Sequence, residues 1–148
     1  MTDNHLSELR FDTLEIHDDL RQGIADAGFE FCTPIQASTL PIALKGHDVA
    51  GQAQTGTGKT AAFLIAAYQK VLTGLAADNG AEEGKQRQPK IFILAPTREL
   101  AIQIANDAEV LGKHTGLKIA LAYGGTGYEQ QRRTIEGGID LLIGTPGR

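Results

Sequence analysis

The sequence predicts an α/β domain in which helices flank a parallel β-sheet on both faces. Short apolar runs alternate with longer segments of helical periodicity from about residue 48 onward, which is typical of parallel strands joined by crossover helices. A glycine-rich turn at residues 53–60, between a predicted strand and a predicted helix, adds a phosphate-binding loop. At 148 residues the chain is long enough for one domain with its own core, and no second domain or repeat is visible.

Two helices are expected ahead of the sheet. Residues 18–27 place apolar side chains on one stripe, and Gly28 should close this helix. The second helix should begin at Thr33, a good N-cap, with Pro34 in the first helical position. Pro41 should kink or end it, because proline lacks the N–H that a helix interior needs.

The remaining elements alternate between strand and helix. The expected strands lie at 48–50, 90–95, 117–123 and 139–143, and the expected helices at 58–75, 97–113 and 128–136. The run at 90–95 is continuously apolar, as in a strand that is covered on both faces. The polar, glycine-dotted stretch at 76–89 is expected to form an exposed loop.

Composition and charge narrow the class of protein. A net charge of −4 argues against a broad basic surface for nucleic acid, so any such contact must come from a few placed groups. The single cysteine, Cys32, has no disulfide partner in the chain; a buried small residue is favoured over a reactive thiol. No segment resembles an export signal or a membrane span, so a cytoplasmic protein without a membrane partner is expected.

The phosphate-binding loop is the strongest motif. It comprises Ala53, Gln54, Thr55, Gly56, Thr57, Gly58, Lys59 and Thr60. The glycines let backbone N–H groups turn onto phosphates, and the following helix N-terminus adds partial positive charge. Lys59 should reach the β- and γ-phosphates, and the Thr60 hydroxyl should coordinate Mg²⁺; these two are the candidate catalytic residues. The alternative is a glycine-rich turn with a surface lysine, and Ala53 stands where the motif usually has glycine.

Five segments in order resemble the motifs of DEAD-box RNA helicases. They are residues 28–36 with Phe11 upstream (Q motif), 53–60 (motif I), 96–100 (motif Ia), 124–125 (GG) and 145–148 (motif Ib). The resemblance implies the N-terminal RecA-like P-loop NTPase domain of an ATP-dependent RNA helicase, incomplete before the DEAD box. Residues 1–46 would form the Q-motif region and lead-in helices, and residues 47–148 the first part of the ATP-binding domain.

The resemblance implies ATP with Mg²⁺ and RNA as ligands. Gln36 carries a donor and an acceptor that match the adenine N6 and N7 edge, whereas a surface glutamine is the alternative. Phe11 is implied to stack on the adenine, and a core phenylalanine is the alternative. The phrases at 49–54 and 121–125 look most like a bacterial member of the family, which implies a bacterial RNA-degradation complex as a partner.

The implied RNA contacts lie in the last three motifs. They are Pro96, Thr97, Arg98, Gly124, Gly125, Thr145, Pro146, Gly147 and Arg148. Such contacts address phosphate and ribose, so they predict little sequence specificity and weaker binding at high salt. The alternatives are a Thr97 N-cap with an Arg98–Glu99 surface pair, and plain turns at the glycine segments.

The carboxylates and arginine that phosphoryl transfer to water requires cannot be assigned. The resemblance places the Asp-Glu-Ala-Asp box and the arginine fingers beyond residue 148. The chain alone is therefore expected to bind nucleotide weakly at most and not to hydrolyse ATP. A P-loop enzyme of another class, such as a small-molecule kinase, and an RNA- or partner-binding module that has lost catalysis are the rival hypotheses.

Overall fold

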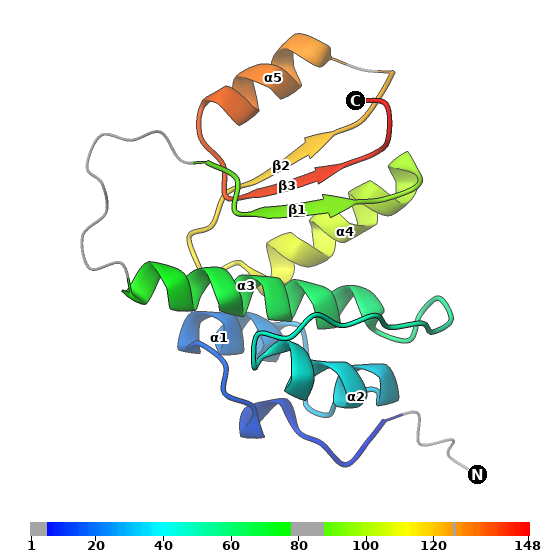
Figure 1. The fold of residues 1–148 in the computed structure, drawn as a ribbon, viewed down its shortest axis with the longest axis vertical. Helices are drawn as coiled ribbons and strands as arrows, with labels where there is room; N and C mark the ends of the chain where they lie inside the picture. Colours follow the sequence, from blue (N-terminus) through cyan, green and yellow to red (C-terminus); the bar gives the residue numbers. More distant parts are fainter. Residues whose placement is uncertain (1–5, 78–87, 126) are drawn as a thin grey trace.

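The computed structural model describes residues 6–77, 88–125 and 127–148. Its sheet has three parallel strands in the order β1-β3-β2 (Figure 1). The strands are β1 (Ile91–Leu94), β2 (Ile119–Ala122) and β3 (Leu141–Gly144). Ile91 pairs in register with Leu141, which pairs on its other side with Ile119. All three strands therefore end at the same edge of the sheet.

Helices lie on both faces of this sheet, as the alternation predicted. The elements are η1 (Phe11–Thr13), α1 (Asp18–Asp26), α2 (Pro34–Ala43), α3 (Lys59–Ala77), α4 (Arg98–Leu111) and α5 (Tyr128–Glu136). Helix α4 packs against β2 and β3, and α5 covers β2 from the opposite side. Helix α3 packs against α4, and α1 and α2 lie on the far side of α3 from the sheet (Figure 1).

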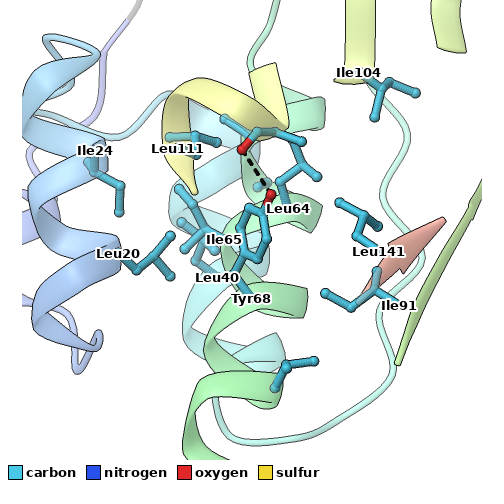
Figure 2. Close-up of a cluster of buried hydrophobic side chains, with 14 of the residues drawn as sticks. Leu20, Ile24, Leu40, Leu64, Ile65, Tyr68, Ile91, Ile104, Leu111 and Leu141 are labelled. Carbon is cyan, nitrogen blue, oxygen red and sulfur yellow. Dashed lines mark hydrogen bonds between the residues drawn. The ribbon is translucent and has the colours of Figure 1, made fainter. Parts of the chain in front are cut away.

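The core runs between α1, α3, α4 and the inner face of the sheet (Figure 2). Tyr68 of α3 is fully buried, and its hydroxyl donates to the Ala108 carbonyl oxygen of α4 at 2.8 Å. Helices α1 and α4 approach so closely that a Cβ on Gly23 would overlap the Leu111 carbonyl oxygen. These contacts fix α4, and with it the polar segment from which α4 begins.

One prediction about the chain before α3 is wrong, and another is wrong in part. Residues 48–50 form no strand: they are exposed, and no described strand pairs with them. Three residues of moderate apolarity become a strand only where a neighbour accepts their hydrogen bonds. Pro41 does not end helix α2, which runs on to Ala43: the Leu44 N–H still bonds the Leu40 carbonyl oxygen at 2.9 Å, and a kink at Pro41 stays a prediction.

The prediction that β1 is covered on both faces is also wrong. Phe92 is 64% exposed and Leu94 is 58% exposed, whereas Ile91 on the other face is buried. Helix α5 contacts β2 and leaves the same face of β1 uncovered. The strand itself and the strand expected at 117–123 are confirmed with shorter bounds, and the strand expected at 139–143 is confirmed at Leu141–Gly144.

The remaining expectations concern a loop, a cysteine and the membrane. Most of the loop expected at 76–89 lies outside the described residues, and Ala76 and Ala77 belong to α3. Cys32 is buried, and burial raises the pKa of its thiol to about 11, which confirms the structural interpretation. No helix within the described ranges is long and apolar enough to cross a membrane.

Candidate nucleotide and nucleic-acid site

The phosphate-binding loop leads directly into α3, as the motif requires. Gly56 and Gly58 adopt positive φ angles of 81° and 84°, a conformation that L side chains rarely adopt. The Lys59 ammonium group donates to the Ala53 carbonyl oxygen, so the lysine side chain lies along the inside of the loop. Because α3 begins at Lys59, the free N–H groups of its first turn and the helix dipole act at the same place. This arrangement suits a polyphosphate.

Gln36 connects helix α2 to this loop. Gln36 is only 3% exposed, so the surface-glutamine alternative is wrong. Its Oε1 accepts from the Thr33 N–H at 2.8 Å, and its Nε2 donates to the Gly58 carbonyl oxygen at 3.1 Å. The Thr33 hydroxyl oxygen lies beside Gly58, buried and without a partner among the described residues. Each of these two atoms keeps a second hydrogen-bonding position, one acceptor on Oε1 and one donor on Nε2, and adenine recognition by Gln36 stays a prediction.

Phe11 lies in the core, which agrees with the alternative of a core phenylalanine rather than with a ring exposed to adenine. It is 3% exposed and stacks on Phe29, with ring centroids 6.1 Å apart and planes at 25°. Phe29 is 41% exposed, so Phe29 is the ring of this pair that reaches the surface. Phe29 belongs to the 28–36 segment compared with the Q motif, but it was given no role of its own from the sequence.

The three predicted RNA-binding segments lie together at the carboxyl edge of the sheet. Residues 96–98 follow β1, residues 124–125 follow β2 and residues 145–148 follow β3 (Figure 1). Hydrogen bonding continues past the strand ends, from the Ala95 N–H to the Gly144 oxygen at 2.8 Å and from the Thr145 N–H to the Ala122 oxygen at 3.0 Å. The phosphate-binding loop lies at the same end of the molecule (Figure 1).

Most of these residues are exposed, and both arginines lie over aromatic rings. The Arg98 Cζ is 4.9 Å from the centroid of the Tyr123 ring, and the Arg148 Cζ is 5.3 Å from that of Tyr128. The Thr97 hydroxyl caps α4 by accepting from the Leu100 N–H at 3.2 Å. No ion pair joins Arg98 to its neighbour Glu99 within the described part of the chain. Of the alternative given for this segment, the Thr97 N-cap is therefore found and the Arg98–Glu99 surface pair is not.

The loop fits ATP phosphates better than it fits a complete metal site. The Thr60 hydroxyl stands at the start of α3, half-buried and next to Lys59. Within residues 6–77, 88–125 and 127–148, no group of three or more His, Cys, Asp and Glu side chains is placed to hold a metal. The part of the chain that the structure describes thus places no carboxylate cluster beside the Thr60 hydroxyl, and Mg²⁺ coordination by Thr60 stays a prediction.

A glycine turn that feeds a helix N-terminus, tied to α2 and set at the carboxyl end of a parallel sheet, defines a nucleotide-binding P-loop α/β domain. The model of the DEAD/DEAH box helicase family matches residues 33–148, and the chain belongs to this family. This match confirms the predicted family. Membership of the family implies the use of ATP.

Similar proteins include bacterial RNA helicases. The chain is 55% identical over 148 residues to the ATP-dependent RNA helicase RhlB of Shewanella piezotolerans and 56% identical to that of Pasteurella multocida. These matches cover 100% of this chain and 33% and 34% of those proteins, so the chain spans about a third of its relatives. The resemblance to a bacterial member, of the RhlB type, is confirmed.

A solved structure supports the fold. The crystal structure of a DEAD box protein from the hyperthermophile Methanococcus jannaschii matches 95% of this chain and 35% of that chain, with a TM-score of 0.77 and 35% sequence identity. The predicted α/β, RecA-like class, present in part, is therefore confirmed.

Proposed function

We propose that this chain is the N-terminal nucleotide- and RNA-binding part of an ATP-dependent RNA helicase. The observation that carries the proposal is the buried Gln36–Gly58 hydrogen bond, which joins the Q-motif segment to the phosphate-binding loop. That loop lies at the end of the molecule where the three RNA-motif segments gather (Figure 1). The whole protein would couple ATP binding and hydrolysis to the separation of RNA strands, whereas this chain alone would not hydrolyse ATP.

The nucleotide half of the site would bind the phosphates of ATP with Mg²⁺. The loop glycines turn N–H groups inward, and the Lys59 ammonium would leave the Ala53 oxygen for the β- and γ-phosphates. Thr60 would give one hydroxyl ligand to Mg²⁺, which supplies charge neutralisation between the phosphates. Residues 53–60 as a whole would surround the phosphates.

The adenine end would lie beside α2. Gln36 would contact the adenine edge, and the aromatic pair of Phe11 and Phe29 would lie next to the ring. Because Phe11 is buried, the direct stacking contact falls to Phe29, with Phe11 supporting it from the core. Phe11 thus keeps a place in the cofactor site, but behind the contact surface.

The RNA half would bind the sugar–phosphate backbone. Arg98 and Arg148 supply guanidinium groups for phosphates, and Thr97, which opens α4, adds a hydroxyl at a helix N-terminus. Gly125 and Gly147 adopt positive φ angles of 88° and 92°, and their lack of a side chain lets the RNA backbone approach. Contacts of this kind read backbone rather than base sequence.

The setting we propose is a bacterial cytoplasm, and the proposed partner assembly is an RNA-degradation complex. The support is the 55% identity to proteins named RhlB from bacteria. We also propose residues 1–46 as the Q-motif region and residues 47–148 as the first part of the ATP-binding domain; the two would be joined through α2 and α3, which pack together.

The test uses the full-length protein with three variants. Lys59→Ala should abolish ATP binding and RNA-stimulated ATP hydrolysis, because the loop loses its phosphate-binding charge. Lys70→Ala, on the exposed face of the same helix, should behave as wild type and is the matched control. Arg98→Ala should weaken RNA binding and leave ATP affinity in place. Wild-type ATP affinity in Lys59→Ala would contradict the nucleotide site, and an RNA-independent ATPase would favour a P-loop enzyme of another class.

A further inference from the structure

The two arginines in the RNA-motif segments share an arrangement that the sequence motifs do not include. Arg98 lies over Tyr123 at 4.9 Å, and Arg148 lies over Tyr128 at 5.3 Å. Tyr123 directly follows β2, and Tyr128 is the first residue of α5. Two arginines from separate segments therefore lie over tyrosines at the two ends of one connection, Tyr123 just after β2 and Tyr128 at the start of α5.

Tyr123 is itself held in place from α5. The Gln131 Nε2 donates to the Tyr123 carbonyl oxygen at 3.2 Å, so the backbone at the end of β2 is fixed by a side chain one turn into the helix. The Tyr123 ring is half-buried, whereas Tyr128 is 58% exposed. The Arg98 guanidinium also reaches Gly125, where a Cβ would lie 4.0 Å from its Nη1.

A guanidinium that lies on an aromatic face keeps its N–H donors free. The ring attracts the cation through its face, while the donors point outward in the guanidinium plane and match phosphate oxygens. Arg98 and Arg148 form no ion pair with a carboxylate among the residues that the structure describes. A long side chain already restricted by the ring also loses less rotamer freedom when it binds.

We propose that Tyr123 and Tyr128 are positioning residues that hold the Arg98 and Arg148 guanidinium groups in place for RNA phosphates. The tyrosines act through the arginines, so ring aromaticity matters and the tyrosine hydroxyl does not. This inference rests on the proposed RNA contacts of the two arginines. It adds the two tyrosines to the glycine pair, Gly124 and Gly125, as residues near the end of β2 that serve RNA binding.

The experiment measures binding of single-stranded RNA by the full-length protein, together with RNA-stimulated ATP hydrolysis. Tyr123→Leu should weaken RNA binding about two- to fivefold, the range of an exposed cation–π contact. The RNA concentration for half-maximal ATPase should rise by the same factor, with the rate at saturating RNA unchanged. Tyr123→Phe should bind as wild type, because it keeps the ring face.

A double-mutant cycle separates positioning from a merely structural role. In an Arg98→Ala background, Tyr123→Leu should have no further effect, because the group it positions is absent. Tyr128→Leu and Tyr128→Phe repeat the comparison against Arg148→Ala at an exposed ring, so the test survives if Tyr123→Leu unfolds the protein. Equal losses in the leucine and phenylalanine variants, or the same loss without the arginine, would overturn the inference.

The two levels of the proposal fail in different ways. If Arg98→Ala and Arg148→Ala leave RNA binding unchanged, the proposed RNA contacts themselves are wrong. If those variants weaken binding and flatten its salt dependence while both tyrosine-to-leucine variants bind as wild type, only the positioning role is wrong.

Discussion

The side-chain amide of Gln36 donates a hydrogen bond to the carbonyl oxygen of Gly58 at 3.1 Å, across 22 positions of sequence. The same amide accepts from the Thr33 N–H, so one buried side chain both begins α2 and fixes the last residue of the loop before α3. A substitution at Gln36 should therefore alter the phosphate-binding loop, and a substitution at Gly58 should alter the start of α2.

Gln36→Ala should lower both stability and nucleotide affinity. The Thr33 N–H loses its partner, which costs about 1–2 kcal/mol in the free energy of unfolding by urea. In the full-length protein, ATP affinity should fall and the preference for ATP over GTP should shrink, as competition binding would show. Gln103→Ala, an exposed glutamine on α4, is the control. An unchanged ATP-to-GTP ratio would remove Gln36 from adenine recognition, while leaving its structural role.

Gly58→Ala should disable the loop, whereas Gly74→Ala in the helix that follows it, α3, should not. At Gly58 the φ angle of 84° strains any L residue, and a Cβ would overlap the Gln36 amide nitrogen. A loss of about 1–3 kcal/mol in stability and about tenfold or more in ATP affinity follows. At Gly74 a Cβ meets nothing within 4 Å, so helix propensity predicts a gain of about 0.5–1 kcal/mol. Effects of the same sign at both glycines would contradict this reasoning.

Gly23→Ala should destabilise the chain although the glycine lies within a helix. Replacement of a helical glycine by alanine usually stabilises, but here the methyl group would overlap the Leu111 carbonyl oxygen and force α1 away from α4. We expect a loss of about 1–3 kcal/mol in the free energy of unfolding. Urea denaturation of Gly23→Ala beside Gly74→Ala provides the comparison, and a stabilised Gly23→Ala would show that α1 and α4 pack less closely than described.

The contact between Asp26 and His114 should make stability depend on pH. Their Oδ2 and Nε2 atoms are 2.6 Å apart, and this hydrogen bond, with a smaller contribution from Lys113, lowers the pKa of Asp26. A carboxyl with a lowered folded-state pKa stabilises above its unfolded value of about 3.9 and loses that contribution as pH falls through the folded value.

Asp26→Asn should therefore lower the thermal midpoint at pH 5 to 6, and its difference from wild type should shrink as pH falls below about 4. Asp48→Asn, at an exposed carboxylate without an ion-pair partner among the described residues, should show no such change. A difference between wild type and Asp26→Asn that stays constant from pH 6 to pH 3 would mean that the contact does not shift the Asp26 pKa.

Local patterns predicted the elements that local forces determine. Helix α5 has the predicted bounds, and α4 begins where the Thr97 N-cap placed it. Residues 48–50 and the exposed face of β1 could not be predicted, because pairing and coverage depend on neighbours that periodicity does not identify. An apolar run such as 91–94 indicates that a strand can be buried, and only packing decides whether it is.

The site divides in the same way. The positive φ angles of Gly56 and Gly58 followed from the loop motif, since only glycine adopts them without strain. Other features of the site depend on contacts between segments far apart in sequence. They are the Gln36–Gly58 hydrogen bond, the packing of Phe11 on Phe29, and the placement of the two arginines over tyrosine rings. Residue types alone did not indicate these contacts, apart from the core position that was the alternative for Phe11.

The strand order has one more consequence for the proposed RNA path. Because β3 lies between β1 and β2, the sheet edge presents residues 96–98, then 145–148, then 124–125, which is not the order in which the chain is synthesised. An RNA strand that crosses this edge would meet the earliest segment beside the latest one. A longer or shorter connection between β2 and α5 would then alter one end of the proposed RNA-contacting surface. The neighbouring segments after β1 and β3 would keep their register.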